Sequence, residues 1–162
     1  MPEAQASTTT TTTYHGGENR VQFSEHGDNA PHTIFIGFGA PGPSSPELAV
    51  LQAHLSPVSS IKWSAGTSPL STTLPEGTSA QTVLLPYSDA TLFGLLVQGK
   101  TPESVTEAGK VAIRALKDAA SSSGIKAEDL KKAVAKAKFL AAEVAEGREG
   151  LVSTLGPLVR QV

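Results

Sequence analysis

Alternation of apolar and polar residues predicts strands in the first two thirds of the chain. Apolar and polar residues alternate in 19–25, which is typical of a strand with one buried face. Residues 33–39 form a nearly continuous apolar run that both faces of a sheet could bury. Residues 81–86 and 91–98 flank the turn-forming sequence Tyr-Ser-Asp-Ala, so we expect them to form an antiparallel hairpin.

Helical spacing of apolar residues appears in three further segments. Ser45, followed by proline, predicts the start of a short helix. Thr101, also followed by proline, predicts a longer helix that ends at Gly124, and a third helix is expected over 128–147. A last short segment covers 151–155. The apolar positions that carry these periods are Leu48, Leu51 and Leu55; Val105, Ala108, Ala112, Leu116 and Ala119; and Leu130, Ala133, Val134, Ala137, Ala141, Val144 and Ala145.

Two segments show no regular period. Residues 1–13 include six consecutive threonines and are predicted to be a disordered tail or interdomain linker, because they have too little apolar surface to repay ordering. Residues 56–80 are rich in serine and proline, and a loop of that length usually indicates function or mobility. The remaining residues, 14–162, are expected to form a single domain. Strands followed by helices predict the α+β class, with an antiparallel sheet and helices packed on one side.

Composition excludes several classes of protein. The chain has 162 residues, 17% of them charged, with a formal net charge of −2 and no cysteine. Bulk electrostatic binding of nucleic acid needs concentrated positive charge, which is absent here. Disulfides, thiol catalysis and thiolate metal sites are excluded by the lack of cysteine. No apolar run approaches the ~20 residues that a membrane-spanning helix needs.

The residues that could carry catalysis do not form a recognised motif. No histidine belongs to an H-x-x-E-H or helical i, i+4 pair, although His26 and His32 could meet in space, with a metal site as the minor alternative to a solvated turn. Ser88 and Asp89 lack a nucleophile elbow. Glycines in 37–42 are expected to end a strand rather than hold a phosphate. We therefore predict no catalytic, cofactor-binding or metal-binding residue. The four histidines are His15, His26, His32 and His54.

Two other features leave alternatives open. A cationic stretch on the last long helix is flanked by acidic residues, which favours a solvated face with helix ion pairs; contact with an anionic lipid or partner is the alternative. Trp63 either packs the 56–80 loop onto the core or anchors an interface, where tryptophan is enriched. The cationic residues are Lys131, Lys132, Lys136 and Lys138, and the acidic ones are Glu128, Asp129, Glu143 and Glu146.

Several sequence strings carry a family resemblance. Residues 14–20 read Tyr-His-Gly-Gly-Glu-Asn-Arg, residues 87–94 read Tyr-Ser-Asp-Ala-Thr-Leu-Phe-Gly, and residues 60–63 read Ser-Ile-Lys-Trp. Together with the Ala/Lys-rich helix over 127–138, they resemble the C-terminal domain of the core protein 2 family of mitochondrial ubiquinol–cytochrome c reductase, respiratory complex III. This family belongs to the mitochondrial-processing-peptidase, or pitrilysin-like, superfamily. The resemblance covers about nine-tenths of the chain, from residue 14 onwards.

The resemblance implies a function without catalysis. It implies a structural subunit that supports assembly and stability of complex III in mitochondrial electron transport, peripheral to the inner membrane on its matrix side. The implied partners are core protein 1 and other complex III subunits, with no nucleic acid and no cofactor. The superfamily's H-x-x-E-H zinc motif has no counterpart here, so no metal or catalytic residue is carried over.

Other expectations accompany this resemblance. The alternative function is the non-catalytic half of a mitochondrial zinc metallopeptidase, the processing peptidase; a weaker one is a free-standing binding module that uses the 56–80 loop. The domain is expected to lack the last helix and strand of the family's domain. An obligate interface and an unpaired sheet edge would make the isolated chain oligomeric or aggregation-prone.

Overall fold

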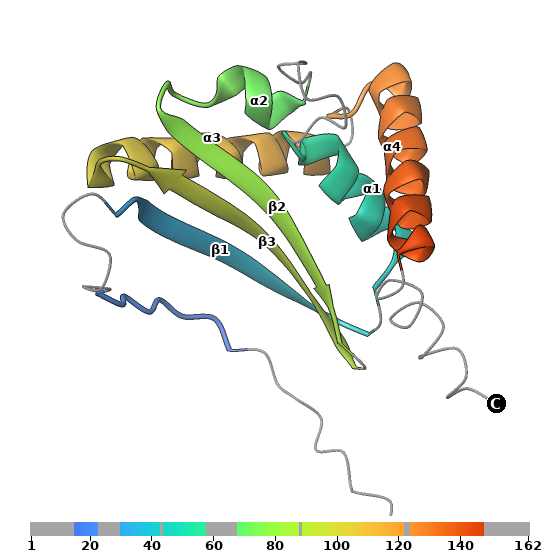
Figure 1. Ribbon diagram of the computed structural model, residues 1–162, viewed down its shortest axis with the longest axis horizontal. Coiled ribbons are helices and arrows are strands. Elements are labelled where there is room, and N and C mark those ends of the chain that lie inside the picture. The colour runs from blue at the N-terminus through green and yellow to red at the C-terminus, as the bar shows by residue number, and fades with distance from the viewer. Residues whose placement is uncertain are drawn as a thin grey trace, which may run out of the picture.

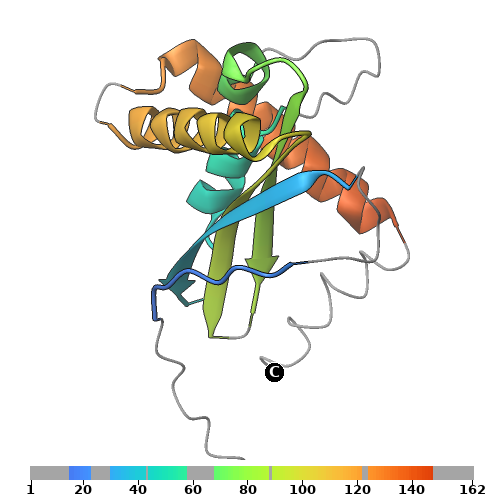
Figure 2. The same cartoon turned by 90° about the vertical axis from the view of Figure 1, so that its left-hand side faces the viewer.

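The described part of the chain forms one antiparallel sheet with helices against one of its faces. The computed structural model describes residues 15–22, 30–42, 44–57, 68–87, 89–121 and 124–147. Helices α1 (Pro46–Leu55) and α3 (Pro102–Ala120) lie behind the sheet in Figure 1. In the turned view of Figure 2, α4 (Ala127–Glu146) lies beside α1, against which it packs. The predicted α+β class, with helices on one side of the sheet, is confirmed.

Three strands form the sheet. Their order is β1-β3-β2, with β1 (His32–Pro41) and β2 (Thr78–Pro86) both antiparallel to the central β3 (Ala90–Gly99). The predicted hairpin is confirmed, because the Tyr87 N–H donates to the Ala90 carbonyl over 2.8 Å and the two strands pair along their length. The middle strand therefore determines the position of both edge strands.

The core lies between the sheet and helices α1 and α3. Leu95 on β3 and Leu55 on α1 are completely buried, and the predicted apolar stripe of α3 faces the same interior. The Thr82 hydroxyl of β2 donates to the Gln52 carbonyl of α1 over 3.5 Å, which joins the helix to the sheet. The buried cluster consists of Leu55, Leu70, Ala80, Phe93, Leu95, Val97, Val105, Ala108 and Ala112.

Side-chain caps set the first residues of α1 and α3. The Leu48 N–H donates to the Ser45 hydroxyl over 3.4 Å, as expected for an N-cap serine. Thr101 and Ser104 form a reciprocal capping box, with backbone-to-hydroxyl distances of 3.2 and 3.3 Å. Both predicted helix starts are confirmed. The predicted end of α3 at Gly124 is wrong: the helix ends at Ala120, where the Ser121 N–H donates to the Asp118 carbonyl.

The predicted strand over 19–25 is not present in its described part. Residues 19–22 have no regular structure, and Val21 is 74% exposed. Alternation favours a strand only where a neighbouring strand supplies the backbone hydrogen bonds, and none of the strands in the described part of the chain pairs with these residues. Residues 23–25 lie outside the described residues, as do the predicted tail over 1–13 and the predicted segment over 151–155.

The long irregular connection predicted over 56–80 contains regular structure at its end. Helix α2 (Pro69–Thr73) begins at the N-cap Ser68, and β2 begins at Thr78 rather than after residue 80. The signal was a serine–proline pair like the one that starts α1, but five residues are too few to show a helical period. Trp63 lies outside the described residues.

Candidate interaction surface and polar pocket

The face of the sheet opposite the core is apolar over the middle of the strands and carries no described helix. In β3, Phe93, Leu95 and Val97 are buried, so the residues between them point to the other side. Their partners in the register of β1 and β2 occupy the same side. We call the apolar and glycine residues at the middle of this side the outer face: Phe35 and Gly37 on β1, Val83 and Leu85 on β2, and Leu92, Gly94 and Leu96 on β3. The same register places the polar residues Gln81 and Gln98 on this side, towards the other end of the strands.

A phenylalanine ring fills the middle of the outer face. Gly37 and Gly94 are paired in the register of β1 and β3, and the ring of Phe35 lies over them. A Cβ at Gly94 would overlap this ring, and a Cβ at Gly37 would lie 2.9 Å from Phe35 Cε1. Phe35 is nevertheless 45% exposed, because nothing described covers its other side. The apolar run over 33–39 predicted a strand that a sheet could bury on both faces. The described residues cover only the face of this strand that points towards the core.

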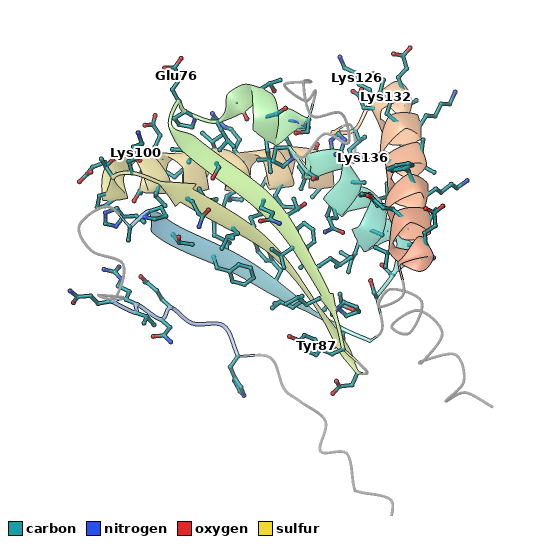
Figure 3. The ribbon with its side chains drawn as sticks, in the orientation of Figure 1. Glu76, Tyr87, Lys100, Lys126, Lys132 and Lys136 are labelled. Carbon is teal, nitrogen blue, oxygen red and sulfur yellow. The ribbon has the colours of Figure 1, made fainter. Side chains whose placement is uncertain are left out.

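The strands of this sheet carry no Asp, Glu, Lys or Arg. Edge strands in soluble proteins usually carry charges or bulges that prevent pairing with other chains. Leu85, near the end of β2, is 42% exposed, and Tyr87 at the hairpin tip is 56% exposed (Figure 3). The outer face and the edges of β1 and β2 are therefore chemically suited to being covered by protein.

Helix α4 buries less of its predicted apolar stripe than the spacing indicates. The predicted helix is confirmed, but among its stripe residues only Ala133 is buried. Leu130 is 44% exposed and Val144 is 54% exposed. The helix packs mainly on α1, a single short helix, which leaves most of the stripe without a described neighbour.

The predicted cationic stretch divides between solvent and a pocket. Lys131, Lys132 and Lys138 are exposed, and only Lys136 is partly buried. Lys132 and Lys136 line a hollow of about 200 Å³ where α4 meets the end of α1 and the start of α2. His54 and Asp129 contribute to the same lining. Figure 3 shows Lys132 and Lys136 at this end of the molecule.

Two polar contacts define the chemistry of this polar pocket. Lys132 Nζ lies 3.3 Å from Asp129 Oδ1, which confirms the expectation of an ion pair along the helix. Lys136 Nζ donates to the Ser56 carbonyl over 3.0 Å, which joins α4 to the end of α1. Partial burial lowers the pKa of Lys136. Burial also lowers the pKa of His54, and the nearby charge of Asp129 acts in the opposite direction.

Comparison with known proteins identifies the family. No protein-family model matches the chain. The mitochondrial cytochrome b-c1 complex subunit 2 of Cryptococcus neoformans is 38% identical over 147 residues, covering 89% of this chain and 33% of the relative. The subunit 2 of Yarrowia lipolytica is 36% identical over 147 residues, covering 90% of this chain and 33% of the relative. That of Neurospora crassa is 42% identical over 130 residues, covering 78% and 27%.

The chain belongs to the cytochrome b-c1 complex subunit 2 family. This confirms the resemblance read from the strings at 14–20 and 87–94, because the b-c1 complex is ubiquinol–cytochrome c reductase. The chain spans about a third of the length of the curated relatives it matches.

The other predicted candidates occupy separate places in this family member. His15 and His32 are both exposed, while His26 and Ser88 lie outside the described residues, so the His26–His32 alternative stays untested. Gly42, with φ of +89°, turns the chain after β1, and its N–H donates to the Asp89 carbonyl over 2.8 Å. Gly42 thus ends the strand as predicted, whereas Gly37 and Gly39, which were also expected to end it, lie within β1.

Neither a metal cluster nor a membrane span is found within the described ranges. No group of three or more His, Asp or Glu residues lies close enough together there to hold a metal ion. No helix among those residues is long and apolar enough to cross a bilayer.

The sequence analysis predicted neither the outer face nor the polar pocket. The lack of charged residues in all three strands was the sequence signal that could have indicated the outer face.

Proposed function

We propose that this chain forms part of a non-catalytic structural subunit of respiratory complex III, supporting assembly and stability of the complex in mitochondrial electron transport. The observation that carries the proposal is 38% identity over 147 residues to a cytochrome b-c1 complex subunit 2. Its partners are core protein 1 and other subunits of the complex. It lies on the matrix side of the inner membrane, peripheral to the bilayer, and corresponds to the C-terminal domain of the subunit.

The physical contribution of this domain is surface for assembly. Obligate subunit interfaces bury about 2,000 Å² or more and are largely apolar. The outer face, with Phe35 and Leu85 both more than two-fifths exposed, supplies such a surface. The uncharged edges of β1 and β2 supply backbone groups for pairing with another strand.

The function is tested by purifying the tagged full-length protein from its own mitochondria and recording a haem absorption spectrum of the eluate. Co-purification of cytochromes b and c1 with core protein 1 is the expected result. Recovery of a processing-peptidase subunit without haem would instead support the metallopeptidase alternative, which the named relatives do not favour.

A matched pair of variants tests the outer face in the same experiment. Leu85 and Leu130 are 42% and 44% exposed, so a lysine at either position disturbs folding little. We expect Leu85→Lys to reduce recovery of haem at least fivefold and Leu130→Lys, on α4, to leave recovery within twofold of the unmodified protein. Equal recovery from both variants would contradict a role of the outer face in assembly.

The isolated 162-residue chain is expected to self-associate, since none of the residues that the structure describes covers the outer face. Sedimentation velocity at increasing concentration measures this directly, and Leu85→Lys is expected to shift the distribution towards monomer. A monodisperse monomer that unfolds in one sharp cooperative transition at every concentration would contradict the expectation.

A further inference from the structure

Helix α4 lies outside the core of the domain. The buried cluster between the sheet and helices α1 and α3 contains no residue of α4, and neither do the partly buried apolar residues that pack against this cluster. Ala133 is the one buried residue that the structure describes on α4, in a helix of 20 residues. Helix α3, of 19 residues, buries four. Since buried apolar groups hold an element in place, α4 is attached to the domain less firmly than α3.

One neighbour supplies most of the packing of α4. Nearly all of its close contacts with other described helices and strands are to α1, and the two helices lie side by side in Figure 1 and Figure 2. Helix α1 also packs on β2 and contributes Leu55 to the core. Separation of α4 from α1 therefore leaves the contacts between the sheet, α1 and α3 in place.

The contact between α1 and α4 is small and partly polar. Ala53 of α1 and Ala133 of α4 are both 3% exposed, and both line the polar pocket. Neither alanine belongs to the core cluster. Lys136 Nζ donates over 3.0 Å to the carbonyl of Ser56, which is the C-cap residue of α1. This hydrogen bond crosses directly from α4 to the end of α1, so its loss weakens the attachment of α4.

We propose that α4 separates from α1 as one unit while the sheet and the other helices stay folded, and that the hydrogen bond from Lys136 to Ser56 holds it closed. Proteins open in cooperative units of this kind, and units with few buried apolar contacts open most often. Opening uncovers Ala133 and the side of α1 on which α4 lies. The assignment does not depend on membership of complex III.

Native-state hydrogen exchange of the full 162-residue chain tests this opening, at low micromolar concentration and with urea below the unfolding transition. A lone helix of this length is only partly formed in water, so its amides exchange once α4 has separated. We expect the amides of 131–146 to share one opening free energy and to exchange at least tenfold faster than those of β3, after correction for intrinsic rates. Their exchange is also expected to depend less on urea, because opening exposes less surface than global unfolding.

A matched pair of lysine variants tests the hydrogen bond. Lys136→Met keeps an unbranched side chain and removes the donor, so α4 is expected to exchange about fivefold faster, the usual effect of losing one hydrogen bond. The control Lys138→Met removes the same charge from an exposed position of the same helix and is expected to change the exchange of α4 less than twofold. One pH is kept throughout, because His54 on α1 lies near the charge of Asp129 on α4.

A mild core variant separates opening of α4 from unfolding of the whole domain. Ile36 packs against the core cluster, and Ile36→Val is expected to make β3 exchange about fivefold faster, as loss of one buried methyl group usually does. The exchange of α4 is expected to change less than twofold, because its opening leaves the core intact.

Three results would overturn the proposal. Equal acceleration of α4 and β3 by Ile36→Val would show that α4 opens only when the domain unfolds. Exchange that slows steadily from the ends of α4 towards its middle would show fraying instead of opening as a unit. Equal effects of Lys136→Met and Lys138→Met on α4 would show that the hydrogen bond to Ser56 does not hold the helix closed.

Discussion

Replacing Leu95 by alanine is expected to lower the free energy of unfolding by about 3 kcal/mol, within the ~2–5 kcal/mol range of leucine truncations in cores. Leu95 lies at the centre of the middle strand and is completely buried. It is paired in register with Ile36 on one side and Thr82 on the other. Truncation of Leu95 leaves a cavity between the three strands and α3. The neighbouring residues on β1 and β2 are held in the sheet, so they can move little to fill that cavity.

The adjacent Leu96 provides the control for this variant. Its side chain points to the outer face, where it is only partly buried, so Leu96→Ala is expected to lower the free energy of unfolding by less than half as much. Urea denaturation followed by circular dichroism, at low micromolar concentration to limit self-association, measures both values. Equal losses for the two variants would contradict the assignment of the core to one face of the sheet.

Replacing Gly94 by alanine is expected to lower the free energy of unfolding by about 1–3 kcal/mol, the usual effect of overpacking. A glycine-to-alanine change inside a strand would otherwise be favourable by roughly 0.5–1 kcal/mol, since glycine loses more chain entropy on folding. At Gly94 the new Cβ would overlap the ring of Phe35 and lie 3.3 Å from the Ile36 carbonyl oxygen. The ring has to leave its place over the glycine pair.

Removal of the ring reverses the sign of this effect. In a Phe35→Ala background the obstacle to the Cβ is gone, so Gly94→Ala is expected to become neutral or stabilising. A double-mutant cycle by urea denaturation, under the same conditions, gives the coupling between the two positions. The same loss in both backgrounds would show that the backbone near Ile36, and not the Phe35 ring, requires glycine at position 94.

Local sequence signals account for much of the fold. The serine–proline pair at 45–46 and the threonine–proline pair at 101–102 predicted the first residues of two helices, because capping depends on groups within one helical turn. The hairpin between β2 and β3 was predicted from its turn residues for the same reason. The strings at 14–20 and 87–94 were sufficient to indicate the family that the comparisons confirm.

Contacts between distant segments decided the rest. The alternating residues at 19–22 form no strand, since alternation does not specify a partner for the backbone. The spacing of α4 predicted an apolar stripe but not that α1 would cover one side of it. Lys136 and the Ser56 carbonyl meet across 80 residues. The sequence by itself determined the family and most of the elements, because those signals are local. Only the tertiary structure determined the open outer face and the polar pocket, because each depends on which surfaces the packed elements leave uncovered.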